Sequence, residues 1–311
     1  MPDASSDMQR RIQAVREDRE HGSRWLVRET IQILRDLAIR VEQEQDSQGH
    51  NAPQLAVLYD TGRQLAQARP AMAALAHAVG RVLHVQGGAA GMKQAANRLL
   101  HDYDTATTRI TEHATPFLHG TVLTCSISGT VLEVLSACKG SISRVIALEG
   151  RPRYEGREMA QSLAKHEIPL TVITDAEADI FMPLSDMVVV GADSVLANGD
   201  VLNKAGTALL GWSAQGHTIP FYVLCETLKI APYLWSTTAY EQNLAMLEEK
   251  EGSEVWAQPL QGVTVRNFYF DHTPANLVSK VITEQGVLSR QEIERIAQQA
   301  RDDAQFLAAT Q

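Results

Sequence analysis

Cys125 is a candidate catalytic residue because of its type and its surroundings in the sequence. It follows a short apolar run and leads into Ser126-Ile127-Ser128-Gly129-Thr130, a hydroxyl-rich turn that opens a helical stretch. Backbone N–H groups around Ile127, Ser128 and Gly129 would hold a phosphate and would also lower the pKa of the thiol. Such a thiol can act as a base. By spacing alone, the more common alternative is that Cys125 is a small hydrophobic residue of the core.

A second group of polar residues begins at Asp193. This residue comes directly after the apolar run Val188 to Val190, and Asn203 and Lys204 precede the next helical stretch. The run predicts a strand from whose end Asp193 projects, and Lys204 at the helix start would supply a point charge for a phosphate. Alternatively, the acidic residues cap a helix and the nearby glycines form turns. The density of carboxylate, amide and ammonium groups favours a functional site.

Further cations follow two other predicted strands. Lys229, at the end of Cys225-Glu226-Thr227-Leu228-Lys229, would lie at the same sheet edge as Asp193 and Lys204 and would add a second positive charge there. The segment Arg151-Pro152-Arg153-Tyr154-Glu155-Gly156-Arg157 adds three guanidinium groups, which suit phosphate oxygens. A solvated lysine and structural salt bridges explain these residues equally simply.

Several other kinds of site have no support in the sequence. There is no G-x-G-x-x-G after a predicted strand, no Walker motif, no G-x-S-x-G and no H-E-x-x-H, and the cysteines form no C-x-x-C pair. We therefore expect no cofactor and no metal. The formal charge of -9 argues against binding to nucleic acid or to an anionic membrane. No run approaches the roughly 20 apolar residues of a membrane span, and we expect a cytoplasmic protein.

The spacing of apolar residues changes along the chain. From about Met8 to Leu100 it is helical, with a loop expected over Glu42 to Ala52 and a new helix at Arg69-Pro70. After about Pro116, short runs rich in valine and isoleucine alternate with helical stretches, and a helical tail runs from Ser289 to Leu307. The expected strands are Thr121 to Cys125, Arg144 to Leu148, Leu170 to Thr174, Met187 to Gly191 and Phe221 to Cys225. The expected crossover helices are Thr130 to Cys138, Gly156 to His166 and Asn203 to Gln215.

Repeated strand–helix units predict an α/β fold. We expect an N-terminal all-helical domain over residues 1–115 and a Rossmann-like domain over residues 116–311, with a doubly wound, mainly parallel sheet. Ligands of such sheets bind at the carboxyl ends of the strands. Cys125, Asp193 and Lys229 all follow predicted strands, so this rule places a site among them.

The order of these motifs resembles that of a known superfamily. Its branches are the regulatory subunits of the initiation factor 2B exchange factor, the methylthioribose-1-phosphate isomerases and the archaeal-type ribose-1,5-bisphosphate isomerases. The matching segments are Arg151 to Arg157, Gly191-Ala192-Asp193 through Asn203-Lys204, Ile219 to Val223, Phe270-Asp271-His272-Thr273-Pro274 and Ile282 to Gly286. The ribose-1,5-bisphosphate branch is also matched by Arg69-Pro70-Ala71-Met72, Glu226-Thr227-Leu228-Lys229 and, loosely, Gly22-Ser23-Arg24.

The resemblance implies an aldose–ketose isomerase of a phosphorylated pentose, most closely of ribose 1,5-bisphosphate, with Cys125 as base and Asp193 as acid. It implies a homodimer or larger homo-oligomer that pairs through the Rossmann-like domains. Two alternatives stay open: a non-catalytic regulatory subunit that senses a sugar phosphate or nucleotide, and an isomerase of another sugar such as methylthioribose 1-phosphate. The regulatory subunits generally lack the cysteine. The implied substrate-binding residues are Gly22, Ser23, Arg24, Arg69, Ile127, Ser128, Gly129, Asn203, Lys204 and Lys229.

Overall fold

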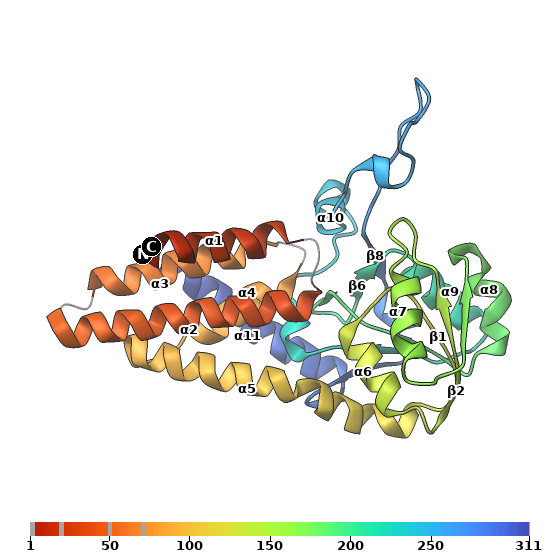
Figure 1. Cartoon of the computed structure of the whole chain (residues 1–311), viewed down its shortest axis with the longest axis horizontal. Coiled ribbons are helices and arrows are strands. Elements are labelled where there is room, and N and C mark those ends of the chain that lie inside the picture. Colours follow the sequence, from red (N-terminus) through yellow and green to blue (C-terminus); the bar gives the residue numbers. More distant parts are fainter. Residues whose placement is uncertain (1–3, 19–21, 49–51, 70–71, 311) are drawn as a thin grey trace. The chain divides into compact units, whose positions relative to one another are not determined.

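The structure is a computed structural model that describes residues 4–18, 22–48, 52–69 and 72–310. It divides into two units (Figure 1), each of which is described by itself. The helical unit consists of Met1–Thr105, Leu228–Pro232 and Arg295–Gln311, and the α/β unit consists of Ala106–Thr227 and Tyr233–Glu294. Within the described ranges, no helix is both long and apolar enough to cross a membrane.

This division differs from the predicted one, which has a single boundary after residue 115. Ile110 and Ala114 lie in the core around the sheet, so the end of the fifth helix belongs to the α/β unit. Leu228 and Leu307 lie in the core of the helical unit, which therefore gains two segments from the second half of the chain. Hydrophobic packing between residues distant in sequence makes this division, and local periodicity does not record it.

The helical unit is built on helices that each bury one apolar stripe. Each of the first five helices has at least one fully buried side chain, as at Ile12, Ile31, Leu58, Leu75 and Met92. Burial of such a side chain contributes about 1.5–3 kcal/mol to the free energy of unfolding. The loop predicted over residues 42–52 was wrong over its first seven residues, because the second helix continues to residue 48. The helices are α1 (Ala4–Glu17), α2 (Ser23–Gln48), α3 (Ala52–Ala66), α4 (Ala73–Leu83), α5 (Gly88–Ala114) and α11 (Arg290–Ala309).

The C-terminal helix α11 was predicted from sequence periodicity, and the structure confirms it. Within the helical unit it packs on the end of α4 through both charge and stacking. The carboxylate of Asp303 lies 2.7 Å from Nδ1 of His84, and the ring of Phe306 stacks on the same imidazole with centroids 4.2 Å apart. These contacts anchor the final helix in the unit.

The α/β unit contains a seven-stranded sheet in the order β10-β9-β7-β4-β1-β2-β3. Its strand pairs are parallel except for β9 with β10. The five predicted strands are confirmed, each within two residues at its ends. The strands are β1 (Gly120–Thr124), β2 (Ile142–Leu148), β3 (Leu170–Ile173), β4 (Met187–Val190), β7 (Phe221–Leu224), β9 (Lys280–Thr283) and β10 (Gly286–Leu288).

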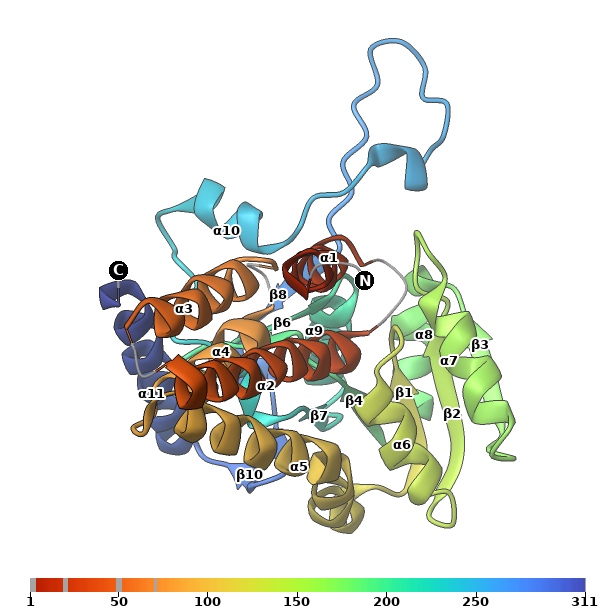
Figure 2. The same cartoon turned by 60° about the vertical axis from the view of Figure 1, so that its left-hand side comes forward.

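The sheet is doubly wound, as predicted. From β1 the chain moves outward through β2 and β3 and then returns to the other side of β1 as β4, from which it continues to β7 and β9. Because such crossovers are right-handed, this reversal places helices on both faces, and Figure 2 shows α6 and α7 in front of β1 and β2. The α-helices of this unit are α6 (Gly129–Ala137), α7 (Glu155–Ala164), α8 (Ala178–Phe181), α9 (Thr207–Gly216) and α10 (Tyr240–Met246). The 3₁₀ turns of the chain are η1 (Thr115–Phe117), η2 (Asp175–Glu177), η3 (Met182–Leu184), η4 (Thr227–Lys229), η5 (Gly252–Glu254) and η6 (Ala275–Leu277).

A second, three-stranded sheet was not predicted. It consists of β5 (Ser194–Val195), β6 (Val201–Lys204) and β8 (Phe270–Thr273), paired antiparallel in the order β5-β6-β8. The helix predicted from Asn203 was therefore wrong at its start, and α9 begins at Thr207. Residues 201–204 are extended because their backbone pairs with a strand almost 70 positions later, a partner that a local pattern cannot reveal.

Position 156, in the first turn of α7, requires glycine because the backbone of Leu148 lies very close to it. A Cβ atom at this position would lie 1.6 Å from the carbonyl oxygen of Leu148, at the end of β2. Gly156→Ala is therefore expected to lower the free energy of unfolding by about 3 kcal/mol, because backbone atoms must move. Urea denaturation measures this effect. The matched control is Gly216→Ala at the end of α9, where a Cβ has open space. Equal stabilities of the two variants would contradict the prediction.

Candidate functional site

The point where the chain reverses its direction through the sheet lies between β1 and β4. Ligands of open α/β sheets bind in the crevice at the carboxyl ends of the strands at such a point. Cys125 directly follows β1, and Asp193 follows β4 by three residues. In the parallel register, Leu123 pairs with Val188, so continuing the register brings Cys125 beside Val190. The structure thus brings the predicted cysteine and aspartate to neighbouring strand ends.

Cys125 is buried, and its thiol lies 3.4 Å from the hydroxyl oxygen of Thr207. That hydroxyl donates its only hydrogen to the carbonyl oxygen of Lys204 at 2.7 Å and accepts from the amide of Asn203 at 2.9 Å. A hydroxyl has one hydrogen and two acceptor positions. The remaining position faces the sulfur, so the thiol is the donor in this contact and is protonated at rest.

The ionisation of Cys125 differs from the sequence-based expectation. We predicted a thiol pKa lowered by a helix N-terminus, but burial, with a smaller contribution from the nearby carboxylate of Asp271, raises the pKa to about 12. Removal of the thiol from water disfavours its anion, and this effect outweighs the favourable charge of Lys204. The correction concerns the resting protein: Cys125 must first lose its proton before it can accept one.

The turn after Cys125 is tightly built. The side chain of Ser128 accepts from the backbone N–H of Val131 at 3.3 Å, so Ser128 caps α6, whose first residue is Gly129. Ile127 is 40% exposed. A Cβ at Gly191, after β4, would lie 2.8 Å from the hydroxyl oxygen of Ser128. Glycine thus allows the end of β4 to approach this turn closely.

The residues from Asp193 to Lys204 belong to the small sheet. The backbone N–H of Asp193 donates to the carbonyl of Leu202 at 2.9 Å, which fixes the start of the segment to β6. Asn203 and Lys204 lie on β6 itself and are buried. Lys204 Nζ lies 2.6 Å from the Glu155 carboxylate and 4.2 Å from the ring centroid of Tyr269. Its charge is therefore already balanced by Glu155, the first residue of α7.

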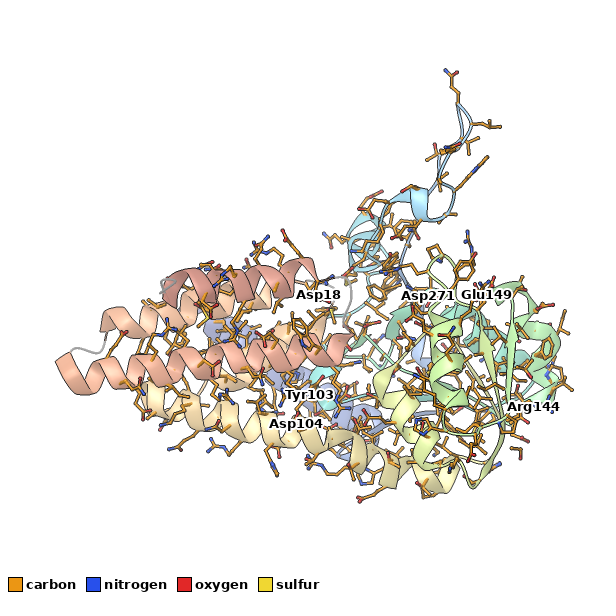
Figure 3. The ribbon with its side chains drawn as sticks, in the orientation of Figure 1. Asp18, Tyr103, Asp104, Arg144, Glu149 and Asp271 are labelled. Carbon is orange, nitrogen blue, oxygen red and sulfur yellow. The ribbon has the colours of Figure 1, made fainter. Side chains whose placement is uncertain are left out.

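Asp271 belongs to the same group of residues and was missed as a site residue. It lies on β8 directly opposite Asn203, and paired residues of an antiparallel ladder face the same side of the sheet. One carboxylate oxygen accepts from the backbone N–H groups of Gly206 and Ala208 at 2.7 and 3.0 Å. The sequence signal was its place in the Phe270–Pro274 motif, which we used only to recognise the resemblance. In Figure 3, Asp271 lies at the same end of the α/β unit as Glu149, which directly follows β2.

The other predicted binding residues belong to the helical unit. Gly22 is exposed, Ser23 and Arg24 lie in the first turn of α2, and Lys229 is buried at the end of η4. The Arg69 guanidinium donates to the carbonyl oxygens of Val15, at 3.4 Å, and Asp18. Pro70 and Ala71 of the predicted motif lie outside the described residues. Arg69 thus holds the C-terminal end of α1, which is the structural role that any single arginine readily takes.

No group of three or more histidine, cysteine, aspartate or glutamate side chains in the described part of the chain is arranged to hold a metal ion. Two buried carboxylates of the α/β unit, Asp200 and Glu226, bind protein donors. Asp200 accepts from Nε2 of His272 at 2.8 Å and from the backbone N–H of Ala275 at 2.9 Å, and Glu226 accepts from Thr130 at 2.7 Å. These bonds hold the loops around the strand ends.

Comparison with known proteins gives a consistent result. Residues 19–290 match the initiation factor 2 subunit family. A ribose 1,5-bisphosphate isomerase of Archaeoglobus fulgidus is 32% identical over 235 residues, which span 72% of this chain and 74% of the relative. A methylthioribose-1-phosphate isomerase of Trichoplax adhaerens is 40% identical over 53% of this chain and 47% of the relative. The crystal structure of the Pyrococcus horikoshii OT3 translation initiation factor eIF-2B has a TM-score of 0.74 and 27% identity, covering 91% of this chain and 96% of that chain.

Proposed function

Because the chain belongs to the initiation factor 2 subunit family and resembles its isomerases, we propose that it is an aldose–ketose isomerase of a phosphorylated pentose, with ribose 1,5-bisphosphate as its substrate. The observation that carries this proposal is the placement of Cys125 and Asp193 on neighbouring strand ends at the reversal point of the sheet. A cysteine and an aspartate held at this edge supply the two proton-transferring groups that the reaction needs.

The proposed reaction moves two protons in each half. In the first half, ionised Cys125 takes the proton from C2 of the sugar while the bond from C1 to the ring oxygen breaks and Asp193 protonates that oxygen. The product is an open-chain enol with a double bond between C1 and C2. In the second half, the Cys125 thiol protonates C1 while the Asp193 carboxylate takes the proton of the 2-hydroxyl group. At the end of the second half Cys125 is again ionised and Asp193 again protonated, as at the start of the first half.

Several residues of the α/β unit support substrate binding. The turn that leads into α6, from Ile127 to Gly129, has backbone N–H groups of the kind that bind phosphate at a helix start. Lys204 offers an ammonium group, which in this structure is paired with Glu155, and Asn203 orders the hydroxyl that contacts Cys125. The substrate-binding roles of Gly22, Ser23, Arg24, Arg69 and Lys229, which belong to the helical unit, stay predictions from the sequence resemblance.

The direct test is incubation of the protein with ribose 1,5-bisphosphate, followed by ¹³C NMR. Appearance of the ketone signal of ribulose 1,5-bisphosphate supports the proposal, and solvent deuterium at C1 would report the protonation step. Methylthioribose 1-phosphate tested in parallel decides between the two substrates. Absence of any ketose product from either compound would refute the isomerase assignment.

A second candidate is a regulatory protein that binds a sugar phosphate without converting it. Its specific support is the resting state of Cys125, a buried thiol with a pKa raised to about 12. The similarity to the translation initiation factor eIF-2B of Pyrococcus horikoshii agrees with this alternative. Tight binding of ribose 1,5-bisphosphate, measured by calorimetry, without turnover would favour it.

We also propose that the protein forms a homodimer through its α/β unit. Ile180, Leu184, Leu209 and Trp212 of the α8, η3 and α9 segments are each more than half exposed, and α8 packs against α9. Exposed apolar groups of this kind mark protein interfaces. Trp212→Glu is expected to convert a dimer into a monomer in sedimentation velocity, whereas Trp256→Glu leaves the mass unchanged. A monomeric wild-type protein would exclude the homodimer.

A further inference from the structure

Asp271 has a position in the site that neither the proposed acid nor the proposed base explains. Its partner across the ladder is Asn203, whose amide donates to the Thr207 hydroxyl that contacts Cys125. The carboxylate of Asp271 binds the N–H groups on both sides of Thr207, those of Gly206 and Ala208. The ladder pairing and the backbone hydrogen bonds therefore both place Asp271 near Thr207, the residue that contacts the thiol.

The two oxygens of Asp271 have different surroundings. Oδ2 receives both backbone hydrogen bonds, whereas Oδ1 is buried and has no hydrogen-bond partner among the residues that the structure describes. The nearby side-chain donors are engaged elsewhere, since Asn203 donates to Thr207 and Lys204 to Glu155. A buried carboxylate oxygen without a donor is costly, and native sites satisfy such atoms.

The ionisation of Asp271 agrees with this position. Burial raises the pKa of Asp271 to about 6, against the two backbone hydrogen bonds that lower it. The group is therefore mostly ionised at neutral pH, and its negative charge raises the pKa of Cys125. A hydrogen bond to Oδ1 would stabilise the Asp271 anion and weaken its repulsion of a thiolate.

We propose that Oδ1 of Asp271 accepts a hydrogen bond from a hydroxyl group of the bound sugar phosphate, beside the thiol of Cys125. This inference rests on the proposed function and adds a residue that selects hydroxylated sugars over their deoxy analogues. A site built to bind a hydroxyl rejects a ligand that lacks it, because the buried acceptor stays unpaired. The same contact links ligand binding to the ionisation of Cys125.

Asp271→Asn is a suitable test variant because its orientation is dictated by the backbone. The N–H groups of Gly206 and Ala208 require an acceptor, so the amide oxygen occupies the place of Oδ2 and the NH₂ group replaces Oδ1. The variant keeps the cap of α9 but removes the charge and turns the acceptor into a donor. The matched control is Asp186→Asn. Asp186 accepts from the N–H of Thr121 at 2.6 Å, at the amino ends of β1 and β4, away from Cys125.

The first measurement is calorimetric binding of ribose 1,5-bisphosphate and of its 2-deoxy and 3-deoxy analogues. Asp271→Asn is expected to bind the ribose compound about 10- to 100-fold more weakly than wild type, the range for a hydrogen bond to a charged group. One deoxy analogue should bind wild type equally weakly and lose nothing further in the variant. Unchanged binding of all three compounds by Asp271→Asn would overturn the hydroxyl contact.

The second measurement needs no ligand and so separates this inference from the proposed function. Cys125 is alkylated with iodoacetamide at pH 8, and the modified peptide is quantified by mass spectrometry. Asp271→Asn is expected to react about three- to tenfold faster than wild type, because the repelling charge is gone, whereas Asp186→Asn reacts at the wild-type rate. Equal rates in all three proteins would overturn the placement of Asp271 beside the thiol. Failure of wild type to bind any of the sugars would refute the function itself.

Discussion

Cys125→Ser is expected to reduce the turnover of ribose 1,5-bisphosphate by about 10³-fold, within the range that a general base contributes. The serine hydroxyl is a far weaker acid than the thiol, so the anion that removes the C2 proton is lost. Serine is also close in size to cysteine, and its hydroxyl can still donate to the Thr207 hydroxyl, whose oxygen lies 3.4 Å from the sulfur. Steady-state kinetics gives the loss in kcat, and calorimetry should give a Kd within about threefold of wild type.

The control for this substitution is Cys138→Ser. Cys138 is also buried and also lies near a threonine hydroxyl, that of Thr115 at 3.5 Å, but it caps the other end of α6. Its replacement reproduces the chemical change away from the strand ends. A fully active Cys125→Ser enzyme, or equal losses in both variants, would rule out Cys125 as the base.

Lys204→Met is expected to lower the free energy of unfolding by about 3 kcal/mol, because it leaves Glu155 with an incompletely compensated charge in a largely buried place. The ammonium and carboxylate are 2.6 Å apart, with 9% and 17% of their side chains exposed. The second carboxylate oxygen of Glu155 is buried and has no hydrogen-bond partner among the described residues. Without Lys204, the charge of Glu155 would be offset only in part, by the guanidinium of Arg153. Urea denaturation followed by circular dichroism measures the difference.

Two further variants test the physical reason. Adding Glu155→Gln to Lys204→Met removes the orphan charge and should recover at least half of the lost stability. Arg290→Met breaks a pair with Glu294 whose side chains are 74% and 52% exposed, and it should cost less than about 1 kcal/mol. If Lys204→Met proves as stable as Arg290→Met, the buried pair is not an important support of the site.

The sequence was most informative where a local pattern determines the structure. Runs of valine and isoleucine predicted β1, β2, β3, β4 and β7, because buried parallel strands are apolar on both faces. The rule that ligands bind at strand ends then placed Cys125 and Asp193 at one edge, and the register of β1 with β4 agrees with it. The motifs also identified the family correctly.

Features that depend on distant partners could not be predicted in this way. Asn203 and Lys204 looked like the start of a helix, but β8 pairs with them and holds them extended. The raised pKa of Cys125 depends on the burial of its sulfur, which spacing does not record. Asp271 was overlooked for the same reason, since its role depends on amides more than 60 positions earlier in the chain.

The pairing of β1 with β4 also has a consequence for folding. Val122 and Met187 are neighbours in the sheet, although β2, β3 and their helices lie between them in the chain. Closing so long a loop costs entropy before any contact is gained, so non-local strand pairing is a slow step of folding. Cys125 and Asp193 come to neighbouring strand ends only when that step is complete. A growing or partly folded chain can therefore contain well-formed helices and still lack the proposed site.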